Sequence, residues 1–194
     1  YGIPFPDLGE RFDRLEEQLA VITGLWETPV GETFSFAGTH YPITDSPALP
    51  KPLQSPRPPV IVGGHGAKRT PRLAATYADE FNLGFSPMAD FATQKERVTA
   101  ACEARDRDPA TMTWSVALTT VMGTDEAQFT RRADAIVHSP EQLRNDQLGG
   151  TPEEIRDRLG QWAELGVERV YLQVLDLADL DHIAELGEEL VGRV

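Results

Sequence analysis

Residues 58–72 read PPVIVGGHGAKRTPR, and this stretch decides the fold. The β-branched run Val60-Ile61-Val62 between prolines predicts a short strand that is buried on both faces. The glycines after it predict a sharp turn, and a helix begins where the turn ends. Backbone N–H groups that no side chain screens, at the positive end of a helix dipole, are typical of a site for phosphate or another anion. The cations beside this turn are Lys68, Arg69 and Arg72.

The glycine turn, residues 63–66, matches neither of the two common phosphate-loop motifs. A Walker A loop requires Gly before its Lys and Ser or Thr after it, whereas Ala67 precedes Lys68 and Arg69 follows it. A dinucleotide fingerprint that starts at Gly64 meets Arg69 where its third glycine belongs. A tight turn without any ligand is the alternative, because glycine is also a common turn residue. His65 on its own is typical of a polar loop, since no second His, Cys or carboxylate lies nearby at metal-ligand spacing.

The composition is that of an ordinary globular protein. The 194 residues are 40% hydrophobic and 25% charged, which is enough for one domain with a substantial core. The formal net charge of -13 disfavours nucleic acid and anionic membrane surfaces as partners. The single cysteine, Cys102, excludes an intrachain disulfide and fits a reducing cytoplasm. No apolar run approaches the ~20 residues of a membrane span, and no signal peptide is visible.

Hydrophobic periodicity predicts helices that alternate with strands. Leu15, Leu19, Ile22 and Trp26 recur at helical spacing between residues 7 and 26. Residues 33–43 alternate around Ala37-Gly38 and predict a β-hairpin, which a proline-rich connector follows. Later strands are expected at 60–62, 81–85, 114–121 and 167–175, and helices at 67–78, 88–107, 125–137, 151–165 and 180–191.

Strands separated by helices imply a parallel sheet, because each crossover returns the chain to the same end of the sheet. The clearest helix start is Thr151-Pro152-Glu153-Glu154, which combines a hydroxyl cap, a proline at the first helical position and a glutamate three residues after the cap. The pattern alone leaves open whether the sheet is doubly wound or part of a barrel.

Several segments in a fixed order narrow this choice. They are GIPFP at 2–6, ERFDRLEE at 10–17, GLW at 24–26, GTHY at 38–41, KPLQ at 51–54, RPPVIVGG at 57–64, RLAATYAD at 72–79 and GTPEE at 150–154. Together they resemble the luciferase-like flavin-dependent oxidoreductases, and within them the group that uses the deazaflavin coenzyme F-420. The resemblance covers essentially the whole chain.

Members of that family are TIM barrels of the α/β class. The resemblance implies that residues 1–194 are the C-terminal portion of a single barrel domain, with only the later (β/α) units present and the N-terminal strands absent. A full barrel takes ~250 residues. The opening Tyr1-Gly2-Ile3-Pro4-Phe5-Pro6, typical of the middle of a loop, also predicts a fragment. In the family the missing part carries much of the substrate chemistry, so the catalytic residues are unknown and this chain alone should be inactive.

The resemblance also implies an activity and a cofactor. The expected function is hydride transfer between coenzyme F-420 and an unidentified organic substrate, and an FMN-dependent luciferase-like monooxygenase is the alternative, because both cofactors end in phosphate groups. In the family the backbone of this corner holds the cofactor phosphate. The cofactor-binding residues implied here are Gly63, Gly64, His65 and Gly66, with Lys68 and Arg69 as further contacts to the phosphate or the glutamyl tail.

Barrel geometry directs attention to the loops that follow strands, at 63–67, 84–90, 122–150 and 175–179. Phe85, Met88 and Met122 are candidates to line a pocket for an apolar or planar ligand, with ordinary packing as the alternative. His138, in the longest loop, is either a general acid or an exposed loop histidine. The hairpin 33–43 precedes a strand, so we expect it to cover the bottom of the barrel or to pack there.

A hypothesis from another class stays open, namely a non-catalytic half-barrel that binds a phosphate ligand. Its unpaired strand edges would need a partner chain, so a homo-oligomer, most simply a dimer, is expected. Hydrolase chemistry has no support. The pair Glu153-Glu154 lies on one helix and diverges in direction, and no Ser, Cys or Thr lies in a nucleophile-elbow context.

Overall fold

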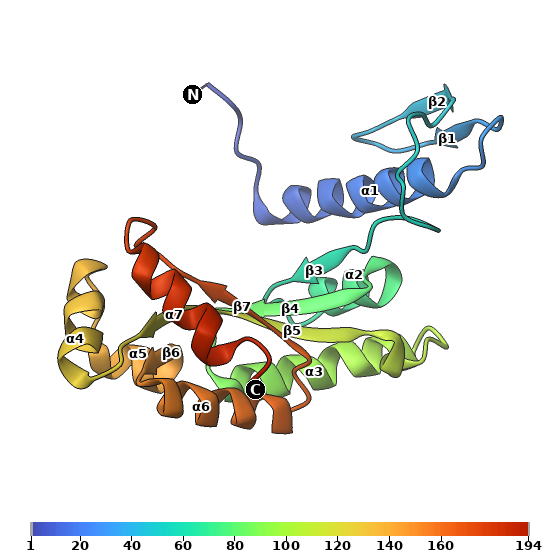
Figure 1. The fold of residues 1–194 in the computed structure, drawn as a ribbon. Coiled ribbons are helices and arrows are strands. Elements are labelled where there is room, and N and C mark those ends of the chain that lie inside the picture. Colours follow the sequence, from blue (N-terminus) through green and yellow to red (C-terminus); the bar gives the residue numbers. More distant parts are fainter. Residues whose placement is uncertain (1, 194) are drawn as a thin grey trace.

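The computed structural model describes residues 2–193. Its centre is a sheet of five parallel strands with helices between them, preceded by a long helix and a two-stranded hairpin (Figure 1). The strands are β1 Phe34–Phe36, β2 Ile43–Ser46, β3 Ile61–Gly63, β4 Glu80–Gly84, β5 Thr113–Met122, β6 Leu148–Gly150 and β7 Arg169–Gln173. The helices are α1 Leu8–Glu27, α2 Arg69–Tyr77, α3 Met88–Glu103, α4 Glu126–Ala135, α5 Pro140–Asp146, α6 Pro152–Glu164 and α7 Leu180–Leu190.

The sheet is organised around the long strand β5. β3 pairs with β4, and β4 pairs with the first half of β5. β5 then pairs with β7 over residues 115–119 and with β6 over residues 120–122. Within residues 2–193 the sheet does not close into a barrel, because β3 and β7 each pair with one strand.

One face of the sheet is apolar and covered by helices. Phe81 of β4 and Trp114 of β5 are register partners, so both side chains lie on this face. Phe91 of α3 packs edge to face against Trp114, with ring centroids 6.5 Å apart, and against Trp162 of α6 at 5.7 Å. Such tilted aromatic pairs stabilise a core beyond the area that they bury. Figure 1 shows α3 and α6 below the sheet, where these rings meet.

The helix α1 and the hairpin form an arm at one end of the sheet (Figure 1). The Glu17 carboxylate accepts hydrogen bonds from the amides of residues 39–41 at 2.8–3.0 Å, which fixes the hairpin on α1. Arg57 joins this arm to the sheet, because its guanidinium contacts Glu27 at 2.8 Å and Asp79 at 2.5 Å. The predicted hairpin is confirmed, and it packs against α1.

The sequence analysis missed two short elements. The expected loop 122–150 contains the seven-residue helix α5 and the three-residue strand β6, and neither is long enough to show a periodic pattern. Gly149 lies inside β6 and not in a turn. A Cβ at this position would lie 2.5 Å from Cβ of Leu143 on α5, so the close packing of α5 on β6 requires glycine here.

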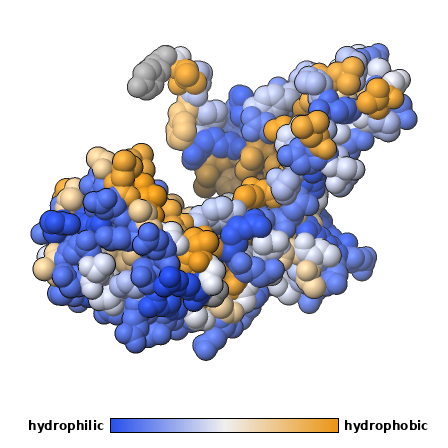
Figure 2. Space-filling model, in the orientation of Figure 1, coloured by the Kyte–Doolittle hydropathy of each residue, from blue (hydrophilic) through white to orange (hydrophobic). Residues whose placement is uncertain are grey.

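The surface carries one apolar region at the far end of the sheet from α1. Figure 2 shows hydrophobic side chains gathered over the loop from β7 to α7 and the beginning of α7. Leu175, Leu177 and Leu180 in this region are 43%, 73% and 69% exposed. None of the helices in residues 2–193 combines the length and the apolar character that crossing a membrane requires.

Candidate functional site

The glycine turn lies at the carboxyl end of β3 and leads into α2. Gly63 approaches the neighbouring strand closely, so that a Cβ there would lie 2.6 Å from the carbonyl oxygen of Asn82. Gly64 has a φ of +131°, which residues with a side chain rarely adopt. At Gly66 a Cβ would lie 2.6 Å from Oγ1 of Thr70. The path of the backbone therefore requires glycine at all three positions.

The amides of this turn are free. Within residues 2–193, no amide of residues 64–70 donates a hydrogen bond to another backbone group. Lys68 occupies the cap position of α2 without a side-chain capping bond, and the first turn of α2 carries no acidic residue. An uncapped helix start that follows free loop amides attracts anions, because N–H groups and the helix dipole act together.

The other glycine-to-helix turn of the chain, at Gly150, differs in this respect. The Glu154 carboxylate accepts the Thr151 amide at 2.7 Å, and Oγ1 of Thr151 accepts the Glu154 amide at 3.4 Å. The hydrogen bond from the Thr151 backbone is the main cause that lowers the pKa of Glu154. The start of α6 is thus occupied by a carboxylate of the chain itself, as the sequence predicted, whereas the start of α2 is not.

The glycine turn is anchored from α3. The side-chain amide of Gln94, a buried residue, donates to the carbonyl oxygens of Gly64 at 3.1 Å and Gly66 at 2.9 Å. His65 is exposed, and its Nε2 lies 3.4 Å from Oγ of Ser86. A cavity of about 230 Å³ opens beside His65. It is lined by His65, Asp90, Thr93, Gln94 and Arg97. No group of three metal-ligating side chains occurs among residues 2–193.

Only one of the three cations predicted beside the turn stays available. Arg69 contacts Asp13 at 2.6 Å and Glu16 at 3.3 Å, and Arg72 contacts Glu16 at 2.5 Å. Both arginines therefore hold α1 against α2, and the expectation that they add mobile charge at the turn is wrong. Lys68 is exposed and forms no ion pair within the described part of the chain. The structure thus brings the glycines, His65 and Lys68 together in one loop.

A second cavity, of about 360 Å³, lies at the carboxyl ends of β4 and β5, and we call it the Phe85 cavity. Phe85 is 52% exposed and has a φ of +56°, a left-handed conformation that is unusual for a bulky residue. Such a backbone costs on the order of 1–3 kcal/mol and is found mostly at functional sites. The Phe85 amide donates to the carbonyl oxygen of Ala117 at 2.7 Å, which holds the residue at the end of the sheet.

The structure separates the other pocket candidates. Phe85 and His138 both line the Phe85 cavity, so the loops after β4 and β5 meet there as barrel geometry predicts. Met122 is fully buried in the core, and its assignment to a ligand pocket is wrong. Met88 is partly buried and packs against the same core. His138 is partly buried, and its Nδ1 lies 2.9 Å from the carbonyl oxygen of Ile136.

The face of the sheet opposite the helices is polar, which the sequence analysis missed. Glu80 of β4 is only 3% exposed, and it binds Arg169 and the hydroxyl of Tyr171, both on β7. The side-chain amide of Asn82 donates to Oγ of Ser115 at 2.9 Å on the same face. The signal was the alternation of these polar residues with apolar ones in β4 and β5, which marks a face that differs from the core.

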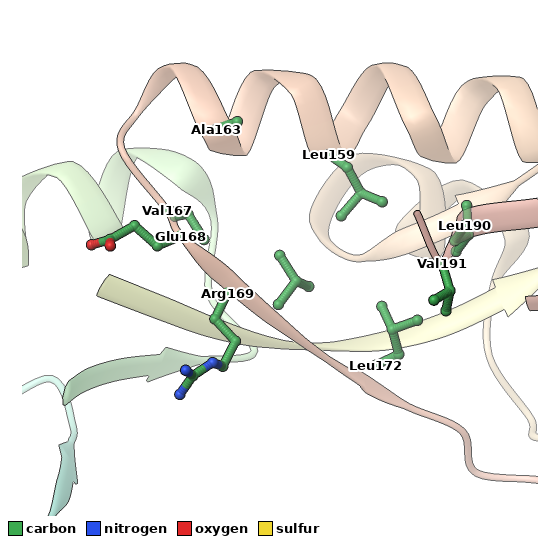
Figure 3. A pocket seen from close by; sticks show the side chains of 9 residues that line it. Leu159, Ala163, Val167, Glu168, Arg169, Leu172, Leu190 and Val191 are labelled. Atoms are coloured by element: carbon green, nitrogen blue, oxygen red, sulfur yellow. The ribbon is translucent and has the colours of Figure 1, made fainter. Parts of the chain in front are cut away.

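The largest apolar cavity lies elsewhere, between α6, β7 and the end of α7, and measures about 330 Å³. Figure 3 shows Leu159, Leu172 and Leu190 pointing into it, while Arg169 is directed away. It includes residues at the start of β7, far from the carboxyl ends of the strands where sites of α/β sheets form. We therefore regard it as a packing gap.

A buried polar cluster ties α4 and α7 to the end of β5. Nε2 of His182 accepts the Met122 amide at 2.9 Å. Arg132 is 6% exposed and contacts Asp179 at 2.8 Å and Glu185 at 2.6 Å. Burial is the main cause that lowers the pKa of His182, and the hydrogen bond from Arg132 lowers the pKa of Asp179. All these groups have partners, so the cluster supports the loops around it.

Comparison with known proteins identifies the family. A family model described as luciferase-like monooxygenase matches residues 1–149, and the chain belongs to this family. The family has F-420-dependent and FMN-dependent members among its oxidoreductases and monooxygenases.

Curated relatives include both cofactor types. The chain is 34% identical over 80 residues to an F-420-dependent glucose-6-phosphate dehydrogenase of Microbacterium testaceum, covering 41% of this chain and 22% of that protein. It is 32% identical over 128 residues to an F-420-dependent hydroxymycolic acid dehydrogenase of Mycobacterium tuberculosis, covering 63% and 32%. An FMNH(2)-dependent dimethylsulfone monooxygenase of Pseudomonas putida is 38% identical over 63 residues, covering 32% and 16%.

Solved structures show the fold. An F-420-dependent secondary alcohol dehydrogenase superposes with a TM-score of 0.78 at 16% identity, over 96% of this chain and 64% of that one. A monooxygenase from Streptomyces bottropensis gives a TM-score of 0.75 at 19% identity, over 95% and 62%. The chain therefore has the fold of the luciferase-like barrel proteins, as predicted, and spans less than two thirds of the length of these neighbours.

Proposed function

We propose that this chain is part of an oxidoreductase in which the glycine turn holds the phosphate tail of a flavin-type cofactor, with deazaflavin coenzyme F-420 as the first candidate. The observation that carries the proposal is the run of free amides at residues 64–70, in front of an uncapped helix. In barrel enzymes the loops after the strands form the active face, and the glycine turn is such a loop.

The residues fit a phosphate group. A side chain at Gly63 or Gly66 would meet Asn82 or Thr70, so glycine keeps the backbone on the path that leaves its N–H groups free. The turn supplies donors without needing several arginines, and Lys68 adds one positive charge. When bound, the cofactor supplies the hydride chemistry, and the protein orients it and excludes water.

The choice of F-420 over FMN follows the relatives. Two of the three curated relatives described above are named as F-420-dependent, and the third as FMNH(2)-dependent. An FMN-dependent monooxygenase is therefore the alternative. The organic substrate of the whole protein is part of the proposal and is not given by the relatives' names.

Direct titration tests the proposal. Purified protein is titrated with oxidised coenzyme F-420 and, separately, with FMN, and binding is followed by cofactor fluorescence. We expect saturable binding of F-420 that is tighter than that of FMN. Tighter binding of FMN would favour the monooxygenase alternative, and binding of neither would refute the cofactor assignment.

Two pairs of variants locate the binding site. Gly64→Val places a branched side chain at a φ of +131° and should abolish most of the binding, whereas Gly160→Ala on α6, where a Cβ meets nothing within 4 Å, should leave it unchanged. Lys68→Gln should weaken binding about tenfold, roughly the effect of one charge-assisted hydrogen bond. Arg131→Gln, at an exposed position of α4, is the matched control for lost charge.

A failed pair would be informative. If Gly64→Val keeps circular dichroism and affinity unchanged, the glycines serve turn geometry only. The assembly of the protein as a homodimer is a separate proposal, and sedimentation velocity measures it directly.

A further inference from the structure

The Phe85 cavity has the size of a small-molecule site. Its volume of about 360 Å³ lies within the usual range of such sites, roughly 300–1,000 Å³. The lining residues used below are Phe85, Thr119, His138, Gln142, Asp146 and Gln147. They come from the loop after β4, from β5 itself, and from the segment between α4 and β6, so three parts of the chain converge on it.

The cavity offers one aromatic face. Phe85 is half exposed although its amide is bound to the carbonyl oxygen of Ala117 at 2.7 Å. A large apolar side chain that a strained backbone keeps at the rim of a cavity, and that the core does not take up, is available for a ligand ring.

The polar groups of the cavity are neutral hydrogen-bonding groups. Nδ1 of His138 lies 2.9 Å from the carbonyl oxygen of Ile136, and because a carbonyl only accepts, Nδ1 carries the proton and Nε2 of the neutral ring is an acceptor. Oε1 of Gln147 accepts the Thr119 amide at 2.9 Å, which leaves its NH2 group as a donor. The side chain of Gln142 has no hydrogen-bond partner among residues 2–193 and can donate or accept.

No cation lines the cavity within the described residues, and its one formally charged lining group is the Asp146 carboxylate. Arg144, two residues away, is engaged by Glu126 at 2.5 Å and Glu154 at 3.4 Å. A phosphate or carboxylate in this cavity would find no positive partner and would be repelled by Asp146.

We propose that the Phe85 cavity is a substrate subsite for uncharged ring compounds that carry a hydroxyl or carbonyl group, and that it rejects phosphorylated or carboxylated ones. The ring packs on Phe85, and the oxygen function meets Gln142, Gln147 or His138. The word substrate rests on the proposed oxidoreductase function, whereas the binding preference rests on the lining residues alone.

The test uses two probes that differ in charge. Benzyl alcohol and benzyl phosphate are titrated into the purified protein without any cofactor, and binding is followed by NMR through the ring signals of Phe85 and His138. We expect benzyl alcohol to bind about tenfold or more tightly than benzyl phosphate.

Variants tie the binding to the cavity. Phe85→Asn keeps a residue that tolerates the left-handed backbone while it removes the ring, and it should weaken benzyl alcohol binding roughly five- to tenfold. For this variant, binding is followed through the His138 signals and those of the probe. Gln142→Ala should weaken it by a smaller factor, and Gln54→Ala, in the exposed connector between β2 and β3, is the matched control.

Each result has a defined meaning. Equal or tighter binding of benzyl phosphate, unchanged affinity in Phe85→Asn, or no binding of either probe would overturn the proposal. Failure of the cofactor titration together with intact benzyl alcohol binding would refute the proposed function and leave the cavity as a ligand site. The converse result would leave the function and refute this inference.

Discussion

The side-chain amide of Gln94 donates a hydrogen bond of 2.9 Å to the carbonyl oxygen of Gly66, and the same amide reaches Gly64 at 3.1 Å. Gln94 is 2% exposed and lies on α3, 28 residues beyond the turn that it holds. Since the carbonyl groups of the turn are bound on this side, its amides stay available for a ligand. The anion-binding character of the turn therefore depends on α3 as much as on its own glycines.

Gln94→Leu tests this dependence. The change leaves two buried carbonyl oxygens without a donor, which should cost about 1–3 kcal/mol of the free energy of unfolding. Affinity for F-420 should fall about tenfold, because the turn loses its fixed shape. Urea unfolding and the fluorescence titration measure the two effects. Thr93→Ala, at the exposed neighbouring position, is the control, and an equal loss of affinity in both variants would contradict the role of Gln94.

Local chemistry explains what the sequence predicted correctly. The turn at residues 63–66, the hairpin and the capped start of α6 each depend on residues that are close in the chain, so their side chains are sufficient evidence. The free amides at residues 64–70 are a property of the same kind, since the lack of a capping side chain before α2 is visible in the sequence.

Contacts between distant residues explain what the sequence did not predict. Arg69 pairs with Asp13, 56 residues earlier, and no spacing pattern indicates that α1 takes this charge. The buried Glu80 is stabilised by Arg169, 89 residues later. The Phe85 cavity joins three segments, and its seven-residue helix α5 is too short to be recognised by periodicity.

The buried His182 predicts a dependence of stability on pH. Burial lowers its pKa in the folded protein, and Nε2 accepts the Met122 amide only when unprotonated. The unfolded chain takes up a proton as the pH falls through about 6.5, whereas the folded chain does not. Unfolding therefore binds a proton in this range, and stability falls as the pH drops from about 6.5 towards the lower pKa of the folded state.

Urea unfolding at about pH 7.5 and about pH 5.5 measures this effect. His182→Asn removes the titrating group, so the difference between the two free energies of unfolding should shrink. Asp179 also has a lowered pKa, but its contribution is lost only as the pH falls below about 3.9. An unchanged difference in His182→Asn would show that other groups cause the pH dependence.

Arg132 should be among the residues on which stability depends most. Its guanidinium is nearly buried, contacts the carboxylates of Asp179 and Glu185, and donates to the carbonyl oxygen of Met122 at 2.8 Å. Arg132→Met leaves these acceptors without their partner, and removing one member of a buried ion pair costs about 3–5 kcal/mol.

Arg131 offers a matched control, because it is exposed on the same helix. Arg131→Met should change the free energy of unfolding by less than about 0.5 kcal/mol. Similar losses in both variants, measured by urea unfolding, would mean that helix composition and not the ion pairs determines the effect.

The start of α6 allows the capping contribution to be separated from the helix dipole. Thr151→Ala removes the hydroxyl that accepts the Glu154 amide, and a lost cap of this kind costs about 1 kcal/mol. Glu153 and Glu154 lie in the same first turn, but only Glu154 accepts the Thr151 amide. Glu154→Ala should therefore destabilise more than Glu153→Ala, although both remove one negative charge near the helix start. Thermal unfolding of the three variants at neutral pH measures the difference. Equal effects of the two glutamate variants would assign the stabilisation to charge alone and not to the capping box.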